Sequence, residues 1–375
     1  MADVLIAGGG IAGSALAILL GRRGLRVELF ERCRFPREKP CGEGLMPAGA
    51  AVIERLGLSA AVGGVRFDGV RYHFGRRVAQ GRFPVGRGFP SSGIGQRRRH
   101  LDRVLFEAAA STAGVTAHTD ATVQEPIWEK DRVVGLVVDG RPRRGRLVVA
   151  ADGARSRLRH RLGLDRPGRQ RRIGLRRHFR LAPGAPESPW VDVFVRNDHE
   201  LYVTPLPDGE LLVAGLGSAR ALGGEAHRRF ELWWRGEPEL ASRLEGAREA
   251  GDLMSASPLS GRARAGFGPG VVLLGDAAGF ADPITGGGMT QALMTAELLA
   301  ESTAAGLETG DDTWLRKFDR SRSRMLRDYR MLTASLLWLS GHPRLAERLL
   351  GGLRVHPGLF SHLLGVSAGM RRLFA

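Results

Sequence analysis

Short apolar runs alternate with segments of helical spacing near the start of the chain. The run Val4–Ala7 is followed by apolar positions that recur every three to four residues as far as Leu20, and Arg26–Phe30 forms a second run. A short continuous apolar run is typical of a buried strand, and the longer period is typical of a helix. The opening therefore predicts a strand, a tight turn, a helix and a second strand.

Two further apolar runs lie far downstream and end in a similar way. Residues 147–151 stop at Asp152–Gly153 before an arginine-rich segment, and Val271–Leu274 stops at Gly275–Asp276 before a glycine-rich helix entry. Both predict buried strands with a carboxylate just beyond the last apolar position. Such carboxylates are candidates for hydrogen bonds to a bound polyol chain.

Other patterns appear in the second half. Polar and apolar residues alternate in three segments, which predicts an antiparallel sheet: 191–198, 200–209 and 211–217. The tail from residue 312 has helical spacing and a short repeat, HPRLAERLL at 342–350 and HPGLFSHLL at 356–364. Each His-Pro pair is expected to begin a helix, since proline suits the first turn. These helices are predicted to cap the core, with contact to a membrane surface through apolar and arginine faces as the alternative.

The turn after the first strand has the chemistry of a dinucleotide site. Gly8, Gly10 and Gly13 are spaced as G-x-G-x-x-G, and Glu31 follows Gly13 by 18 residues at the end of the second strand. The glycines permit the turn, the approach of a pyrophosphate and the packing of helix on strand, and the carboxylate suits ribose hydroxyls. The helix N-terminus adds free N–H groups. Together these features predict a dinucleotide-binding fold.

Composition and charge limit the remaining possibilities. The chain has 375 residues, enough for two domains, and 43% hydrophobic with 25% charged residues is ordinary for a globular protein. The formal charge of +17 comes from arginine spread along the chain, since only three residues are lysine, so nucleic acid is not the expected partner. Cys33 and Cys41 lack a metal or redox spacing, and no metal site is predicted. A cytoplasmic location is expected, and the opening run is expected to be retained because no positive stretch precedes it.

Five segments in order resemble one group of flavoenzymes. The G-x-G-x-x-G turn, the D-G pair at 152, the G-D pair at 275, FPREKPCGEGLMPAGAAVIERLGL at 35–58 and QRRRHLDRVLFEAAASTAGV at 96–115 are similar to motifs of FAD-dependent oxidoreductases of the para-hydroxybenzoate hydroxylase-like and geranylgeranyl reductase-like type. The resemblance covers roughly residues 1–330. It implies FAD as cofactor and an α/β fold in which a Rossmann-like FAD-binding domain of the glutathione-reductase type is interleaved with an antiparallel-sheet substrate domain and followed by a helical tail.

The same resemblance implies which residues contact FAD. Glu31 would bind the adenosine ribose, and the Val123 backbone would lie beside the adenine. Arg98 would lie near the pyrophosphate and ribityl chain, and Asp276 would bind the ribityl chain. Gly288–Met289 would meet the isoalloxazine. The full implied set is Gly8, Gly10, Ala12, Gly13, Glu31, Arg32, Gly42, Arg98, Val123, Asp152, Gly275, Asp276, Gly287, Gly288 and Met289.

Two of these places also have a physical interpretation. The N–H groups at Gly286–Met289, where a helix begins, offer a positive dipole end to the N1/C2 edge of a flavin. Asp152 matches a family aspartate associated with FAD and with the nicotinamide donor. Capping the helix that follows is the alternative for Asp152.

Family members interleave their two domains, and this sequence allows the same division. The FAD-binding domain is predicted to comprise 1–65, 95–165 and 263–311. The substrate domain is predicted to comprise 66–94 and 166–262, and its sheet would roof the flavin. The C-terminal helices are predicted in 312–375.

Few residues are candidates for chemistry beside the flavin. The Cys41 thiol is a candidate for tuning the ring, with service as a small buried side chain as the alternative. Glu43 is a candidate general base for a phenol, with capping of the following helix as the alternative. Tyr202, Thr204 and Pro283 are the candidate substrate contacts. No catalytic base is assigned.

Departures from the family patterns bear on the reaction. The Y-x-W-x-F-P lipid motif of the reductases appears only as Tyr202-x-Thr204-x-Leu206-Pro207. Gly279 stands where many hydroxylases have histidine after GDAA, and Gly286–Gly288 stands where many reductases have GEG. The W-x-W-x-I-P motif of flavin halogenases is absent. Loss of the tryptophan disfavours a polyprenyl reductase.

The sequence therefore favours a monooxygenase of secondary metabolism that hydroxylates a hydrophobic aromatic or polyketide-like small molecule. NAD(P)H would reduce the flavin and O2 would reoxidise it. No motif for a second nucleotide domain is visible, so NAD(P)H would bind transiently across the domain groove, or an electron carrier would replace it. A reductase of an isoprenoid or other alkene is the alternative, and a non-catalytic flavin-binding protein is the third interpretation. The sequence leaves the substrate, the preferred nicotinamide and the oligomeric state open.

Overall fold

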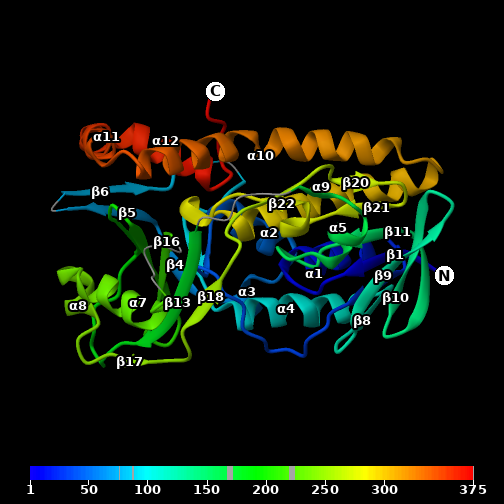
Figure 1. Cartoon of the computed structure of the whole chain (residues 1–375), viewed down its shortest axis with the longest axis horizontal. Helices are drawn as coiled ribbons and strands as arrows, with labels where there is room; N and C mark the ends of the chain where they lie inside the picture. The colour runs from blue at the N-terminus through cyan, green and yellow to red at the C-terminus, as the bar shows by residue number, and fades with distance from the viewer. Residues whose placement is uncertain (76, 87, 167–171, 219–223, 375) are drawn as a thin grey trace.

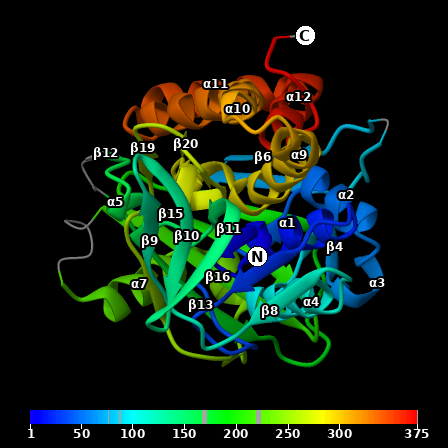
Figure 2. The same cartoon turned by 90° about the vertical axis from the view of Figure 1, so that its right-hand side faces the viewer.

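A computed structural model describes residues 1–75, 77–86, 88–166, 172–218 and 224–374. Two eight-stranded sheets contain most of the described strands, and two three-stranded sheets lie at their margins. The C-terminal helices form a layer along one side of the molecule (Figures 1 and 2).

The first large sheet contains the strands predicted at the N-terminus. Its strand order is β20 (Phe267–Gly268), β21 (Val271–Leu273), β11 (Arg141–Ala150), β1 (Ala2–Ala7), β2 (Val27–Phe30) and β8 (Val115–His118), with β9 (Val123–Glu129) and β10 (Arg132–Val138) attached to β11 as an antiparallel hairpin. The strands from β21 to β8 run parallel. Parallel strands are covered on both faces, which explains why Val4, Leu5 and Ile6 are all fully buried in a continuous apolar run.

Helices cover the faces of this sheet. The helices that come from the FAD-motif segments are α1 (Ile11–Gly21), α2 (Pro47–Arg55), α3 (Ser59–Val62), α4 (Arg98–Ala110), α5 (Arg157–Arg161) and α9 (Gly288–Glu308), with short turns η1 (Gly275–Ala278) and η2 (Pro283–Thr285). α1 contacts both α4 and α9. Every residue of α1 except Leu19 is buried, and a helix that is apolar all round belongs in a protein core.

The second large sheet is antiparallel except at one pair. Its order is β17 (Arg248–Glu249), β13 (Arg172–Arg180), β16 (Glu210–Ser218), β15 (His199–Leu206), β14 (Trp190–Val195), β5 (Gly69–Phe74) and β6 (Arg77–Arg82), with β18 (Met254–Ala256) on β13. β14 and β5 are the parallel pair. The three predicted strands after residue 190 are confirmed as β14, β15 and β16.

The remaining elements are two small sheets and the helices α7 and α8. The small sheets are β3 (Gly44–Leu45), β7 (Gly93–Gly95) and β4 (Val65–Phe67), and β12 (Asp165–Arg166), β19 (Gly261–Ala263) and β22 (Gly279–Phe280). α7 (Ala226–Arg235) and α8 (Pro238–Arg243) supply Phe230, Trp233 and Leu240 to the core of the second large sheet. β5 and β6 join strands from beyond residue 171 in one sheet, as the domain division requires. The division into two domains itself stays a prediction.

The tail is helical, as predicted. It comprises α10 (Thr313–Ser340), α11 (Pro343–Val355) and α12 (Pro357–Ser367). His342 and His356 are the N-cap residues of α11 and α12, with proline in the first turn of each. α10 packs on α9, and α11 and α12 pack on β6. In the described part of the chain, none of the helices combines the length and the apolar character needed to cross a bilayer.

Substituting Gly13 should destabilise the protein through the β1–α1 contact. A Cβ atom at Gly13 would lie 2.0 Å from the Gly8 carbonyl oxygen, so Gly13→Ala should lower the free energy of unfolding by about 3 kcal/mol. Gly352 in α11 is the matched control, because a Cβ there meets no atom within 4 Å. Gly352→Ala should be neutral or stabilising by up to about 1 kcal/mol. Denaturant unfolding measures both, and equal effects would contradict the packing account.

Candidate functional site

The glycine-rich turn lies at the carboxyl edge of the first sheet. Gly8 has φ of +107°, and a Cβ there would lie 2.4 Å from the Ala151 carbonyl oxygen, so this position requires glycine. Gly10 is open: a Cβ there would meet only the Arg37 guanidinium, at 3.6 Å. A Cβ at Gly275 would approach the Ala12 Cβ to 3.0 Å, so the β1–α1 turn and the η1 turn lie side by side.

Glu31 ends β2 beside this turn. One carboxylate oxygen, Oε2, accepts the Gly9 N–H at 3.0 Å, and the other, Oε1, accepts the Cys33 N–H at 3.1 Å. The residue is only 6% exposed. These bonds hold the carboxylate at the mouth of the turn, where the sequence predicted a ribose contact. Arg32, the next residue in the implied set, is exposed.

A buried carboxylate gathers cations next to the glycine-rich turn. Arg98 donates to both oxygens of Asp102, at 2.8 and 2.9 Å, and Arg37 Nη1 lies 2.9 Å from Asp102 Oδ2. Lys39 Nζ lies 3.9 Å from Asp276 Oδ2. Burial acts to raise the pKa of Asp102, but the Arg98 charge and hydrogen bonds, with Arg37 and Lys39, outweigh it and lower the pKa. Asp102 is therefore the anionic centre of a cationic cluster.

This cluster also has a buried donor that no described residue accepts from. Burial, followed by the Arg98 charge, lowers the pKa of Lys39, although 37% of its side chain is exposed. Arg37 Nε is buried and has no hydrogen-bond partner among the described residues. A buried unpaired donor is costly unless a ligand satisfies it. An anionic group such as a pyrophosphate fits this place.

Asp152 and its neighbours follow β11. Its carboxylate accepts from the Ser156 hydroxyl and from the Leu158 N–H at 3.2 Å. Burial raises the pKa of Asp152. Ser156 is the N-cap residue of α5 and accepts the Arg159 N–H at 3.0 Å, and Asp152 shares the capping by accepting the first-turn Leu158 N–H. The hydrogen bond from the Ser156 hydroxyl to Asp152 holds Ser156 in its capping position.

The segment from Gly275 to Met289 forms the opposite wall. Asp276 lies in η1 and is partly exposed. Gly287 is the N-cap residue of α9; its N–H donates to Tyr329 Oη at 3.3 Å, and a Cβ there would lie 2.4 Å from that ring. Gly288 is exposed, and a Cβ there would meet nothing within 4 Å. The start of α9 therefore presents open backbone, as the flavin-edge prediction requires.

Loop 41–44 is fixed by buried hydrogen bonds. Glu43 has φ of 57° and is fully buried; its Oε1 accepts the Arg98 N–H at 3.0 Å, and its Oε2 lies 2.7 Å from His178 Nε2. The Glu43 N–H donates to Cys41 Sγ at 3.4 Å. Capping of the following helix by Glu43 is wrong: α2 has no side-chain cap, and Glu43 caps α4 instead. Gly42 is open, since a Cβ there would meet nothing within 4 Å.

Sequence patterns offered His178 as an ionisable residue without placing it, and they did not identify Arg176. Arg176 Nη1 lies 2.7 Å from His178 Nδ1, and both side chains are buried. Arginine only donates, so Nδ1 is an acceptor and the proton of a neutral His178 is on Nε2, which donates to Glu43. The two residues alternate along β13 and point to one face, a weak signal in the sequence. Arg37, Lys39 and Asp102 were also missed, although they lie within segments that resemble the family.

The three candidate substrate contacts lie close to this loop and to η2. Tyr202 Oη donates to the Ile284 carbonyl at 3.0 Å, and burial raises the pKa of Tyr202 well above its usual value. Pro283 begins η2, next to Ile284. Thr204 is only 2% exposed, and its hydroxyl donates to the Gly42 carbonyl at 2.8 Å. Thr204 therefore anchors loop 41–44.

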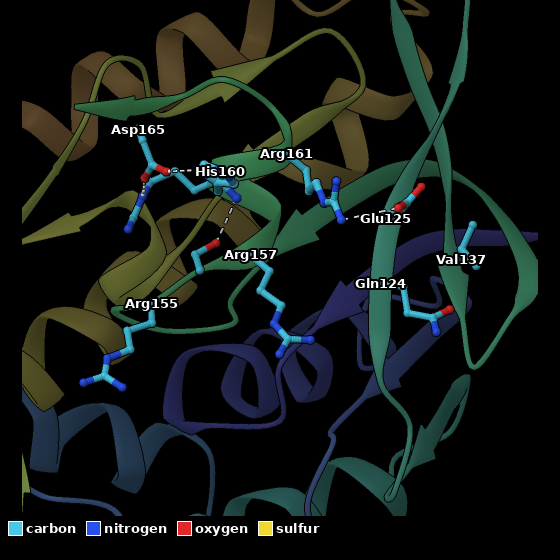
Figure 3. Close-up of a pocket in the computed structure, with 10 residues that line it drawn as sticks. Gln124, Glu125, Val137, Arg155, Arg157, His160, Arg161 and Asp165 are labelled. Atoms are coloured by element: carbon cyan, nitrogen blue, oxygen red, sulfur yellow. Dashed lines mark hydrogen bonds and ion pairs between the residues drawn. The ribbon is translucent and has the colours of Figure 1, made fainter. Parts of the chain in front are cut away.

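A separate surface cavity of about 930 Å³ lies between α5 and the β9–β10 hairpin (Figure 3). Arg155, Arg157 and Arg161 line it, with Glu125 on the hairpin 3.5 Å from Arg161. Ser156 also lines it and connects it to Asp152. The lining is basic, and sequence patterns gave no indication of this cavity beyond the arginine-rich run. The implied adenine neighbour Val123 begins β9, one residue before the cavity lining starts at Gln124.

Comparisons with known proteins agree with this geometry. The sequence model of the family described as FAD binding domain matches residues 1–332. The chain belongs to this family. It is 30% identical over 332 residues to a menaquinone reductase of Mycobacterium tuberculosis, covering 80% of this chain and 76% of that relative. It is 29% identical to squalene monooxygenase of Mus musculus, over 79% of this chain and 54% of that relative.

The fold is also shared with solved structures. A flavoprotein/dehydrogenase from Cytophaga hutchinsonii superposes with a TM-score of 0.86 at 22% identity, over 98% of this chain and 92% of that chain. The family match makes the chain an FAD-dependent oxidoreductase. Its fold is mixed α/β, as predicted. The open backbone at Gly10, Gly42 and Gly288, the cation cluster and the acids Glu31 and Asp276 fit FAD. The contacts of the individual residues with FAD stay predictions.

Removing the charge of Asp102 should destabilise the protein in a pH-dependent way. Asp102→Asn leaves buried cations without their anion, and should cost about 3–5 kcal/mol at neutral pH. Because the folded-state pKa is lowered, the charge of Asp102 stabilises the fold above its unfolded pKa of about 4, and this contribution is lost as the pH falls further. Denaturant unfolding from pH 3 to 7 should show the gap between variant and wild type closing at low pH.

The matched control is Asp68→Asn, which breaks an exposed pair with Arg82 at 2.8 Å. Its cost should stay below about 1 kcal/mol. A pH-independent cost for Asp102→Asn would show that its charge is not the stabilising feature.

Glu31→Gln should weaken FAD binding while preserving the fold. Loss of charge-assisted hydrogen bonds should cost about 1.5–3 kcal/mol, or roughly ten- to hundredfold in Kd. Glu28→Gln on the same strand is the control, since Glu28 lies near Arg143 and His118 and away from the glycine-rich turn. Titration of the stripped protein with FAD measures both, and an unchanged Kd for Glu31→Gln would refute the ribose contact.

Proposed function

We propose that the chain is an FAD-dependent monooxygenase that hydroxylates a hydrophobic aromatic or polyketide-like small molecule, with NAD(P)H as electron donor and O2 as co-substrate. The observation behind this proposal is the environment of Thr204. It bears on the choice between hydroxylation and alkene reduction, which the family leaves open.

Position 204, where the reductase lipid motif has tryptophan, is buried against two glycines of the β3–β7 pair. The Thr204 methyl carbon would lie 3.3 Å from a Cβ placed on Gly95 and 3.8 Å from one placed on Gly44. The hydroxyl is bonded to the Gly42 carbonyl. Tryptophan is much larger than threonine, and overpacking a buried position is destabilising. The departure from the reductase motif is therefore built into the packing of the loop, which supports the hydroxylase interpretation.

Several residues would prepare the site for oxygen chemistry. Bound FAD would supply electron transfer and oxygen activation. The N–H groups at the start of α9 would stabilise negative charge at the flavin edge. Tyr202 stays protonated at neutral pH and holds η2 through the Ile284 carbonyl.

Glu43 serves as a positioning residue in this proposal. Both of its carboxylate oxygens are engaged, by Arg98 N–H and by His178, and the residue is fully buried. An engaged buried carboxylate is a poor general base for an incoming phenol. Glu43 instead holds Cys41 and Gly42 in a fixed loop that would lie beside the flavin. Cys41 stays the candidate for contact with the ring.

Reduction of an isoprenoid or other alkene is the second candidate. It is favoured by the menaquinone reductase of M. tuberculosis, at 30% identity over 80% of this chain. In that reaction the alkene takes up two electrons and two protons, and oxygen is not consumed. The squalene monooxygenase relative favours oxygen chemistry at lower coverage of its own chain.

Labelling with isotopic O2 separates the two reactions. Hydroxylation consumes NAD(P)H, a proton and O2, and places one oxygen atom in the product and the other in water. We expect a phenolic or polycyclic substrate to gain one labelled oxygen atom, measured by mass spectrometry. The control is the same incubation without oxygen, which should give no product. A saturated product formed from reduced enzyme without oxygen would overturn the proposal and establish the reductase.

A further inference from the structure

The outer face of α10 carries a continuous stripe of exposed residues. Its buried face, which includes Leu315, Phe318, Leu326 and Tyr329, packs on the molecule. The stripe on the opposite side, with a spacing of three to four residues, comprises Lys317, Arg320, Arg324, Arg327, Met331, Ala334 and Trp338. The helical layer lies along one side of the molecule in both views, so the stripe faces outward (Figures 1 and 2).

This stripe has a basic half and an apolar half. The basic half is Lys317 to Arg327, and Arg320 and Arg324 form no ion pair within the described part of the chain. The apolar half includes Trp338, which is 56% exposed, and no Asp, Glu, Lys or Arg occurs from residue 331 to 343. Isolated exposed apolar residues are common, but a half-exposed tryptophan within a charge-free stretch marks an apolar surface patch.

α11 continues the apolar half. Leu345 and Leu349, one helical turn apart, are 38% and 47% exposed, and Arg344 and Arg348 lie beside them. The other side of α11 packs on β6. Exposed leucines next to arginines on a helix that is docked from behind give an amphipathic outer face.

The helical layer also concentrates positive charge. Residues 313–374 contain 12 Lys and Arg and 3 Asp and Glu, a formal charge of +9 out of +17 for the chain. Each of the three acids already has a basic partner: Asp319 with Arg322, Asp328 with Arg327, and Glu347 with Arg77. The positive charge of this layer is therefore available to an external anionic surface.

We propose that α10 and α11 dock the enzyme on an anionic phospholipid bilayer. Trp338, Leu345 and Leu349 enter the interface between headgroups and acyl chains, and the arginines of the basic half contact the phosphates. A groove of about 320 Å³ between β6 and α11 adds apolar surface for a lipid acyl chain, with Tyr72, Ala79 and Val355 in its lining. Arg354 also lines this groove and is a donor for a lipid phosphate. This inference concerns where the enzyme works, and it does not depend on the reaction.

The charge pattern favours a bilayer over a protein partner. A bilayer offers one extended anionic plane above an apolar layer, and the stripe presents separate basic and apolar halves on one outer surface. Residues 331–355, which include the apolar half and α11, contain one acid, Glu347, and it is paired with Arg77. A second copy of this chain would bring +9 against +9 at the same face.

Binding of the full FAD-loaded protein to vesicles tests this proposal. Vesicles of phosphatidylcholine with phosphatidylglycerol should bind the protein in a flotation assay, and vesicles of phosphatidylcholine alone should bind it weakly. Arg320→Glu with Arg324→Glu should lower the partition coefficient at least about tenfold. Leu345→Ser with Leu349→Ser should lower it to a similar extent, and higher salt should weaken binding by the wild type.

Matched controls use exposed residues outside the helical layer. Arg141→Glu with Arg229→Glu makes the same change in net charge, and Trp128→Ser removes an aromatic side chain that is 45% exposed on β9. Both should bind vesicles as the wild type does. The proposal fails if the wild type does not bind anionic vesicles, or if the controls lose binding equally. It also fails if the leucine variant abolishes a dimer in gel filtration and leaves vesicle binding unchanged.

Discussion

The buried carboxylate of Glu43 connects segments that are far apart in the sequence. It accepts the first N–H of α4 and the Nε2 proton of His178 on β13, while its own N–H donates to Cys41. A fully buried carboxylate must be satisfied on both oxygens, because an unpaired one would cost several kcal/mol. This requirement fixes the left-handed backbone at residue 43 and thereby the direction of loop 41–44. The first large sheet and the second are joined at this point.

The cation cluster around Asp102 depends on the same helix. α4 begins at the Glu43 cap, and its first turn places Arg98 and Asp102 one turn apart, facing Arg37. Arg37 also lies 3.5 Å from Glu31, and Lys39 lies 3.9 Å from Asp276, so the three cations face three acids around the glycine-rich turn. The buried Arg37 Nε still has no partner among the described residues and stays a donor for an anionic group. The anchoring of α4 therefore decides where the cations of this cluster lie.

Glycine contacts decide how closely the loops of this site approach one another. Gly8 and Gly13 allow the β1–α1 turn to lie against Ala151 and against itself, and Gly287 makes room for Tyr329. Gly10, Gly42 and Gly288 differ, because their missing side chains face open space or the end of a flexible arginine. The first group serves packing and the second leaves backbone free for a ligand. Sequence spacing alone does not separate the two groups.

The sequence by itself determined the order of elements and the nature of the cofactor site. Runs such as Val4–Ala7, the glycine spacing and the His-Pro helix starts depend on neighbours within one or two turns of chain, and local periodicity records such neighbours. Glu31 was found from its spacing to the glycines in a familiar motif. Only the tertiary structure decided that Glu43 accepts the first N–H of α4, that Ser156 shares the capping of α5 with Asp152, and that Thr204 anchors Gly42. It also brought His178 to Glu43, across 135 positions. A hydrogen bond between strands and loops so distant leaves no period in the sequence, because its partners are chosen by the packing of whole sheets and not by spacing along the chain.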